Sequence, residues 1–279
     1  MYKKFAPRKH LQPFIEGIWI QESSDVSNLA SYRPTRVLPT ASVEVTFFYT
    51  DPFVEVSENE TILLPRCLIT GQKTRFKEYL ATGKTGIIIV RFTPWGARPF
   101  LHLPLHELID SNLDLSLVVS PKAVEILENQ LRDSTSLPQK ICLIQDFLAG
   151  LFIEKYTDEL TMWSAHEMAR LNGSPLISHI AQTYNLSTRQ FERRFKNAIG
   201  ISPKKFSSII RFQKAINSQD WNEALMDCNF YDQAHYIKAF KSFSGFTPIT
   251  FHSHQNPTSL ATFFNTHQDV SLFYNTIYL

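Results

Sequence analysis

The spacing of apolar residues changes along this chain, and the first part, up to about residue 108, has the pattern of a β domain. Short runs rich in Val, Ile, Phe and Thr alternate with Pro, Gly and Asp, which favour turns. Phe47 and Phe48 lie in a run without strict alternation, which is typical of a strand covered on both faces. The predicted strands are residues 14–21, 43–49, 53–56, 61–64 and 86–92. The pattern therefore predicts a small β-sandwich or barrel.

Beyond residue 120 the apolar residues recur at helical spacing. The pattern predicts helices over residues 121–132, 137–156 and 158–170. The second of these has an apolar stripe made of Ile141, Ile144, Phe147, Leu148 and Leu151. This stripe either packs on the β domain or forms a dimer interface, and the sequence leaves both readings open.

A repeat near the C-terminus is the most regular pattern in the chain. The motif F-K-x3-G-x-[ST]-P occurs at Phe195–Pro203 and again 45 residues later, at Phe240–Pro248. An internal repeat of this kind indicates that one supersecondary unit is used twice.

Each copy of the repeat is predicted to be a helix with marked ends. Ser187 and Asp232 are N-cap residues, and Gln190 completes a capping box in the first copy. Gly200 and Gly245 predict the left-handed residue that ends each helix. Paired aromatic residues mark the face expected to be buried: Phe191, Phe195, Tyr236 and Phe240. Because a short helix and a tight turn precede each one, both copies are predicted to be helix-turn-helix units.

The opposite face of the first helix is basic. Arg189, Glu192, Arg193 and Lys196 are spaced i, i+3, i+4 and i+7 and therefore share the outward face. The second copy presents Gln233, His235, Lys238 and Lys241. Residues 187–214 contain eight Lys and Arg but one acid, a net charge of +7, which is the electrostatic footprint of a phosphate-binding surface. A solvated helix face is the alternative, but the duplication, the caps and the charge together favour DNA.

At these residues the chain resembles the AraC/XylS family of bacterial transcription regulators, from about Leu160 to His254. The resemblance implies two recognition helices that enter successive major grooves, about 34 Å apart, of double-stranded DNA. Carried over by position, the base-reading residues are Arg189, Glu192, Arg193, Gln233, His235 and Lys238, and the phosphate-binding residues are Ser187, Lys196 and Lys241. The second copy departs from the family pattern at Leu225 and Asn229, in the helix before the turn.

The resemblance also implies a fold class and further partners. We expect an α+β chain with a cupin-like β-sandwich or barrel and trailing helices in residues 1–157, and an all-α DNA-binding domain with two helix-turn-helix units in residues 158–255. A tail of residues 256–279 follows, and its aromatic residues are expected to pack back on the protein. A small-molecule effector, a second copy of the chain and RNA polymerase are the other partners considered.

Composition and charge agree with a two-domain cytoplasmic protein. The net charge of +2 conceals an excess of +5 in residues 174–254 and −3 in the remainder. Three widely spaced cysteines, without a C-x-x-C, suggest neither a disulfide framework nor a zinc site. No signal peptide, membrane span or cofactor motif is evident, and the chain is not expected to be an enzyme.

Three groups of residues in the β domain have a second reading. His102 and His106 are four apart, but Leu103-Pro104-Leu105 disfavours the helix that a shared metal would need. Cys67 is either a reactive thiol or a buried structural residue. Five aromatic residues either line an effector pocket or form core: Trp19, Phe47, Tyr49, Phe92 and Trp95. The alternative functions are accordingly a metal-dependent cupin-like enzyme and a protein-binding adaptor.

Overall fold

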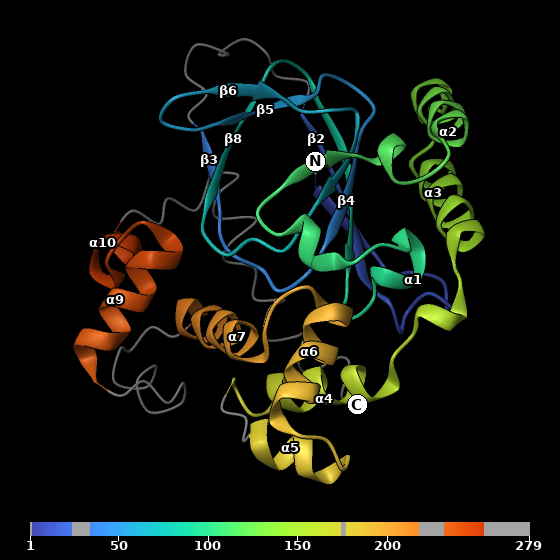
Figure 1. Cartoon of the computed structure of the whole chain (residues 1–279). Coiled ribbons are helices and arrows are strands. Elements are labelled where there is room, and N and C mark those ends of the chain that lie inside the picture. The colour runs from blue at the N-terminus through green and yellow to red at the C-terminus, as the bar shows by residue number, and fades with distance from the viewer. Residues whose placement is uncertain (1, 24–33, 174–176, 218–231, 254–279) are drawn as a thin grey trace. The chain divides into compact units, whose positions relative to one another are not determined.

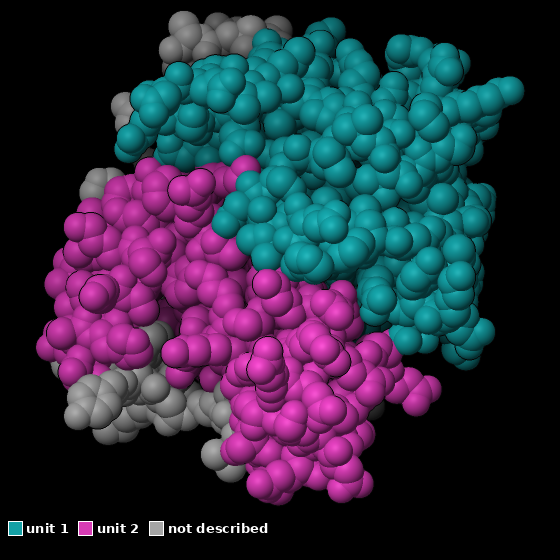
Figure 2. All heavy atoms as spheres, in the orientation of Figure 1, with its two compact units in different colours: residues 1–34, 42–71, 78–157 teal, residues 35–41, 72–77, 158–279 magenta. Residues whose placement is uncertain are grey.

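The computed structural model describes residues 2–23, 34–173, 177–217 and 232–253. These residues form two compact units, coloured separately in Figure 2. Unit 1 consists of residues 1–34, 42–71 and 78–157, and unit 2 of residues 35–41, 72–77 and 158–279. None of the helices in the described ranges has the length and apolar composition that crossing a membrane requires.

Unit 1 is built on antiparallel sheets. The six-stranded sheet has the order β1-β2-β9-β4-β7-β10 (Figure 1). Its strands are β1 (Tyr2–Phe5), β2 (Ile15–Ser23), β4 (Glu44–Phe48), β7 (Cys67–Thr70), β9 (Thr85–Phe92) and β10 (Asn112–Asp114). In a second sheet, β5 (Phe53–Val56) pairs with β6 (Thr61–Leu63) on one side and β8 (Lys77–Ala81) on the other. The predicted β-sandwich or barrel is confirmed, with more strands than the sequence indicated.

The core of unit 1 lies between the six-stranded sheet and three helices. β4 is buried along its whole length, and Val45 lies opposite Ile69 on one side and Val90 on the other. These residues belong to one apolar cluster with side chains of α1 (Arg98–Leu101), α2 (Pro121–Asp133) and α3 (Leu137–Leu151). The predicted strand covered on both faces is therefore confirmed. The cluster buries Ile141, Ile144 and Leu148, so the stripe of α3 packs on this core.

The helix predicted over residues 137–156 is shorter than expected. α3 ends at Leu151, and Phe152 and Ile153 adopt extended backbone angles before a 3-10 turn, η4 (Glu154–Tyr156). The backbone N–H of Ile153 donates to the carbonyl of Pro99 at 2.9 Å. This bond replaces the one that would continue the helix. Two further 3-10 turns, η2 (Leu105–Leu108) and η3 (Leu115–Leu117), lie before α2.

Unit 2 is helical. Its helices are α4 (Glu159–Arg170), α5 (Ile177–Thr183), α6 (Thr188–Ile199), α7 (Pro203–Asn217), α9 (Gln233–Ser244) and α10 (Pro248–Ser253), and the short β3 (Thr35–Val37) also belongs to it. Phe206 of α7 packs on Phe195 of α6, with ring centroids 5.6 Å apart. Phe212 of α7 packs on Phe240 of α9 at 5.3 Å. α7 therefore lies between α6 and α9 (Figure 1).

The described part of unit 2 contains one complete helix-turn-helix, α5 and α6, and the second helix of the other. The helix predicted to precede α9, with Leu225 and Asn229, lies outside the described residues, as does the tail of residues 256–279. The domain boundaries at residues 157 and 255 stay a prediction. The grouping of residues 35–41 and 72–77 with the C-terminal helices was not anticipated from the sequence.

Candidate nucleic-acid interface

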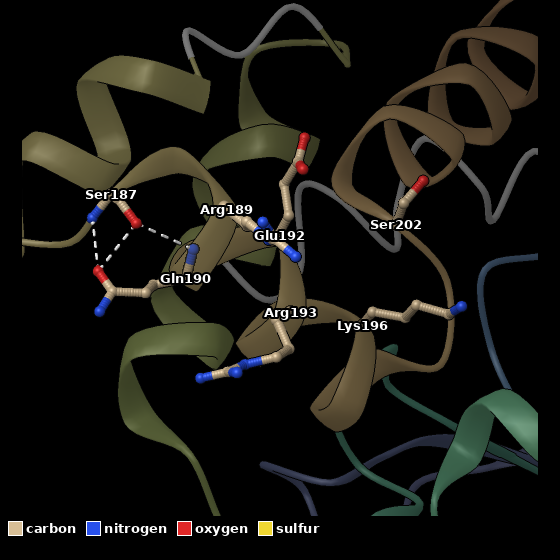
Figure 3. Close-up of a pocket in the computed structure, with 7 residues that line it drawn as sticks. All are labelled: Ser187, Arg189, Gln190, Glu192, Arg193, Lys196 and Ser202. Atoms are coloured by element: carbon tan, nitrogen blue, oxygen red, sulfur yellow. Dashed lines mark hydrogen bonds between the residues drawn. The ribbon is translucent and has the colours of Figure 1, made fainter.

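The start of α6 is fixed by the predicted capping box. The backbone N–H of Gln190 donates to Ser187 Oγ at 3.3 Å, and the backbone N–H of Ser187 donates to Gln190 Oε1 at 2.9 Å (Figure 3). Asn185 has a φ of 53°, the left-handed conformation that turns the chain out of α5. The turn and the cap together set the direction in which α6 leaves the body of the unit.

α6 has one buried and one exposed face. Phe191 and Phe195 are fully buried, with ring centroids 5.7 Å apart. The side chains predicted to point outward are all exposed: Arg189, Glu192, Arg193 and Lys196. The predicted orientation of α6 is therefore confirmed. Whether these residues contact DNA stays a prediction.

The exposed face of α6 borders an open hollow of about 680 Å³. It is lined by Ser187, Arg189, Gln190, Glu192, Arg193, Lys196 and Ser202 (Figure 3). Three of these residues are cationic and one is acidic, so the hollow favours anions. Ser202 and Gln190 were not among the predicted contacts. Ser202 was discernible as a cap, since it precedes Pro203, and its Oγ accepts from the Lys205 N–H at 3.2 Å.

The charge count over residues 187–214 overstates the cationic surface. Arg194 turns back to Asp158, the N-cap of α4, with Nε 2.8 Å from Oδ2. Lys205 lies over the ring of Phe243, with Nζ 4.7 Å from its centroid. Arg211 Nη2 also lies 3.5 Å from Ser208 Oγ, so at least three of the eight basic residues make contacts inside unit 2.

α9 repeats the design of α6. Asp232 Oδ1 accepts from the His235 N–H at 2.7 Å, which confirms the predicted cap. Tyr236 and Phe240 are buried, as predicted. Gln233, His235, Lys238 and Lys241 are all exposed.

The helix ends differ between the two copies. Gly245 ends α9 in the left-handed conformation, with φ 80° and ψ −7°. Gly200 ends α6 with φ 103° and ψ −40°, a positive φ outside the left-handed helical region that was predicted. The sequence was therefore right that both positions need glycine and wrong about the conformation of Gly200.

The residues with a second reading lie in unit 1. His102 ends α1 in a left-handed conformation and stacks on Tyr156, whereas His106 lies in η2. Among the described residues no three His, Cys, Asp or Glu side chains come together as a metal site. Cys67 is buried, and this burial is the main cause that raises the pKa of its thiol. The negative charge of the nearby Glu128 raises this pKa further, and both effects disfavour the reactive thiolate.

The aromatic residues proposed for a pocket make packing or hydrogen-bond contacts within unit 1, and whether any of them lines an effector pocket stays a prediction. Phe47 and Phe92 belong to the core cluster. Trp95 donates from Nε1 to the Pro13 carbonyl at 2.9 Å, and the Tyr49 hydroxyl donates to Glu22 Oε1 at 2.7 Å. Trp19 packs against the guanidinium of Arg91, 4.9 Å from the ring centroid.

Two family models match this sequence. Residues 180–254 match a helix-turn-helix domain, and residues 3–114 match a domain of unknown function (DUF6597). No curated protein matches the chain.

Several solved structures align over most of the chain, but loosely. An apo variant of ToxT from Vibrio cholerae is 10% identical with a TM-score of 0.45, covering 86% of this chain and 97% of its own. ToxT from Vibrio cholerae bound to an unsaturated fatty acid is 11% identical with a TM-score of 0.41, covering 84% and 92%. The AraC-like transcriptional activator CuxR is 13% identical with a TM-score of 0.25, covering 80% and 87%. Similarity at this level carries no argument about ligand or function.

Proposed function

We propose that the chain is a DNA-binding transcription regulator of the AraC/XylS family, whose helices α6 and α9 read adjacent major grooves of one operator in the cytoplasm, and the match of residues 180–254 to a helix-turn-helix domain supports this. The observation that carries this proposal is the outward face of α6, where Arg189, Arg193 and Lys196 surround an open hollow while Phe191 and Phe195 face inward. A helix that is anchored by its aromatic face and exposes long polar side chains has the form of a recognition helix.

Each predicted contact has a chemical reason in the major groove. Arg189 and Arg193 can each donate two hydrogen bonds to guanine, and Glu192 can accept from the amino group of cytosine. Gln233 of α9 can pair with adenine in the same way. Lys196 and Lys241, near the helix ends, would neutralise phosphates and fix the register. A homodimer and contact with RNA polymerase remain predictions.

A gel shift tests this proposal. The wild-type protein is titrated against DNA from upstream of its own gene and against a shuffled duplex of the same composition, at about 50 and 200 mM salt. We expect both complexes to weaken at the higher salt and the upstream complex to keep its advantage. Equal binding to the two duplexes at both salt concentrations would contradict base readout.

We further propose that unit 1 binds a small polar effector that shifts the population of DNA-binding states. Successive residues of a strand face opposite sides, so Glu44 and Thr46 of β4 lie on the face opposite the core residues Val45 and Phe47. Glu44 Oε1 accepts from Arg91 Nε at 2.7 Å. Ligand pockets combine apolar walls with a few polar groups that orient the ligand, and Glu44 and Thr46 would supply such polar groups on this face of β4.

A seam of polar groups joins the two sheets on this side. Asn112 Nδ2 of β10 donates to Glu55 Oε2 of β5 at 2.5 Å and lies 3.3 Å from the Tyr79 hydroxyl of β8. Thr70 of β7 donates to Asn112 Oδ1 at 2.9 Å. A thermal-shift screen of small polar metabolites should find a ligand that raises the unfolding temperature of wild type but not of Thr46→Val. A ligand that stabilises both proteins equally would bind elsewhere.

A further inference from the structure

Residues 72–77, which we call the strap, follow β7 in the sequence yet belong to unit 2 with the C-terminal helices. Arg36 in β3, which precedes β4 in the sequence, also belongs to unit 2. Backbone and side-chain contacts join these residues to α6, α7 and α9. If α6 and α9 read DNA as proposed, these contacts bear on how the two helices are placed relative to each other.

One end of the strap holds the C-terminal end of α6. Gln72 is fully buried, and its Nε2 donates to the carbonyl of Ile199, the last residue of α6. The last carbonyls of a helix have no partner within the helix, so a side-chain donor there fixes the helix end. Gln72 therefore ties the strap to the first recognition helix.

The middle of the strap contacts α7. Lys205, in the first turn of α7, lies with Nζ 3.4 Å from the Thr74 carbonyl. The same ammonium group lies over the Phe243 ring of α9. The strap thus meets the helix that already links α6 to α9.

The other end of the strap holds the C-terminal end of α9. The Phe76 N–H donates to the Phe243 carbonyl at 3.1 Å, and Arg36 Nη1 donates to the Ser244 carbonyl at 3.0 Å. The guanidinium of Arg36 lies between two aromatic rings, 3.9 Å from the centroid of Phe76 and 4.3 Å from that of Phe246. A cation at this position also interacts favourably with the negative, C-terminal end of the α9 dipole.

Phe76 and Arg36 pack closely around Gly245, the glycine that ends α9. A Cβ placed on Gly245 would lie 2.6 Å from Phe76 Cε1 and 2.7 Å from Arg36 Nη1. The positive φ of Gly245 already disfavours any other residue. Both ends of the strap are thus anchored at the C-terminal end of a recognition helix.

We propose that Gln72, Phe76 and Arg36 are positioning residues that set the distance and angle between α6 and α9, and hence the spacing of the two DNA half-sites that one chain accepts. This inference rests on the proposed DNA-reading function. Two linked recognition helices bind a site with two half-sites more tightly than one helix does only where their geometry allows both to bind at once. α7 provides one rigid link between α6 and α9. The strap provides a second link, from residues that lie far from the DNA-facing side chains in the sequence.

Half-site spacing tests the proposal. Binding is measured to duplexes that carry both half-sites at the natural spacing or with about two base pairs inserted between them. We expect wild type to prefer the natural spacing and Arg36→Ala to lose roughly tenfold of that preference. Binding of the α6 half-site alone should stay unchanged, which a general loss of folding would not allow. Arg75→Ala is the matched control, because Arg75 is an exposed cation within the strap.

Gln72→Ala gives a second measurement at the opposite end of the strap, should Arg36→Ala fold poorly. It should reduce the spacing preference in the same direction. An unchanged spacing preference in both folded variants, or an equal effect of Arg75→Ala, would overturn the inference while leaving the proposed function in place. A wild-type protein without a preferred operator would instead show that the proposed function itself is wrong.

Discussion

Arg194 and Asp158 form a two-pronged ion pair, with Nε 2.8 Å from Oδ2 and Nη2 2.9 Å from Oδ1. The same carboxylate caps α4, since Oδ1 accepts from the Thr161 N–H at 3.1 Å. One side chain of α6 is thus attached to the first turn of α4. The consequence is that α6 is held from its exposed flank as well as from its aromatic face.

The charge of Asp158 should contribute to the free energy of unfolding at neutral pH and not in acid. Burial by itself raises the pKa of Asp158, but the hydrogen bonds and charge of Arg194 and the Thr161 N–H outweigh it, so its pKa lies below the ordinary value. Above the ordinary value, about 3.9, the pair contributes fully, and the contribution is lost as the pH falls through the lower value of the folded state. Asp158→Asn, which keeps a capping oxygen, should cost about 0.5–1 kcal/mol at pH 7.

Urea unfolding at several pH values between about 7 and 3 measures this difference. The gap between wild type and Asp158→Asn should narrow in acid. Glu125→Gln, which removes an exposed carboxylate of α2, is the control and should change the free energy of unfolding by less than about 0.5 kcal/mol. A gap that is the same at every pH would show that the ion pair contributes nothing.

Arg193→Ala should weaken binding to the cognate operator by about 1–3 kcal/mol and relax base preference at one position, because a bidentate guanine contact is lost. Fluorescence anisotropy with the operator and with single-base variants measures both effects. Arg132→Ala, in α2, removes the same charge from an exposed position in unit 1. Equal losses on operator and random DNA would assign Arg193 to phosphate contact instead.

Lys196→Ala should weaken binding to operator and random DNA alike, because a phosphate contact carries no sequence information. The slope of log K against log salt should become shallower by roughly one unit, since one fewer counterion is released. Lys122→Ala, at the start of α2, should leave the slope unchanged. If Lys196→Ala also leaves it unchanged, Lys196 does not contact a phosphate.

Local features of the interface could be predicted from the sequence because they depend on residues close together in the chain. The capping box joins Ser187 to Gln190, three residues apart, and Phe191 and Phe195 are one helical turn apart. Helical periodicity then determines which side chains face outward. The same reasoning placed α2, α4 and the long apolar strands within one or two residues of their observed bounds.

Features that depend on distant residues could not be predicted in this way. Arg194 lies 36 residues from Asp158, and Gln72 lies 127 residues from Ile199. A charge count treats Arg194 as part of the DNA-facing surface, whereas Asp158 holds its guanidinium against the start of α4. Two of the missed strands, β8 and β10, are short and polar, so they lack the apolar pattern that identifies a strand.

The close approach of α4 to α7 gives the sharpest prediction about stability. Gly173 follows α4 with a φ of 72°, and its N–H donates to the Met168 carbonyl at 2.8 Å. A Cβ at this position would lie 2.4 Å from the Ser207 carbonyl oxygen of α7, a contact that backbone movement alone could relieve. Gly173→Ala should therefore lower the free energy of unfolding by more than about 1 kcal/mol, through strain at positive φ and through the clash.

Gly150 provides the matched comparison, because it lies within α3 and a Cβ there meets nothing within 4 Å. Gly150→Ala should raise the free energy of unfolding by about 0.4–1 kcal/mol, since alanine restricts the unfolded chain and fits the helix without a contact. Thermal and urea unfolding of both variants show whether the free energy of unfolding falls for Gly173→Ala and rises for Gly150→Ala. Should Gly173→Ala be as stable as wild type, the junction of α4 with α7 would have to be looser than the structure describes, and the anchoring of α6 through α4 would lose its support.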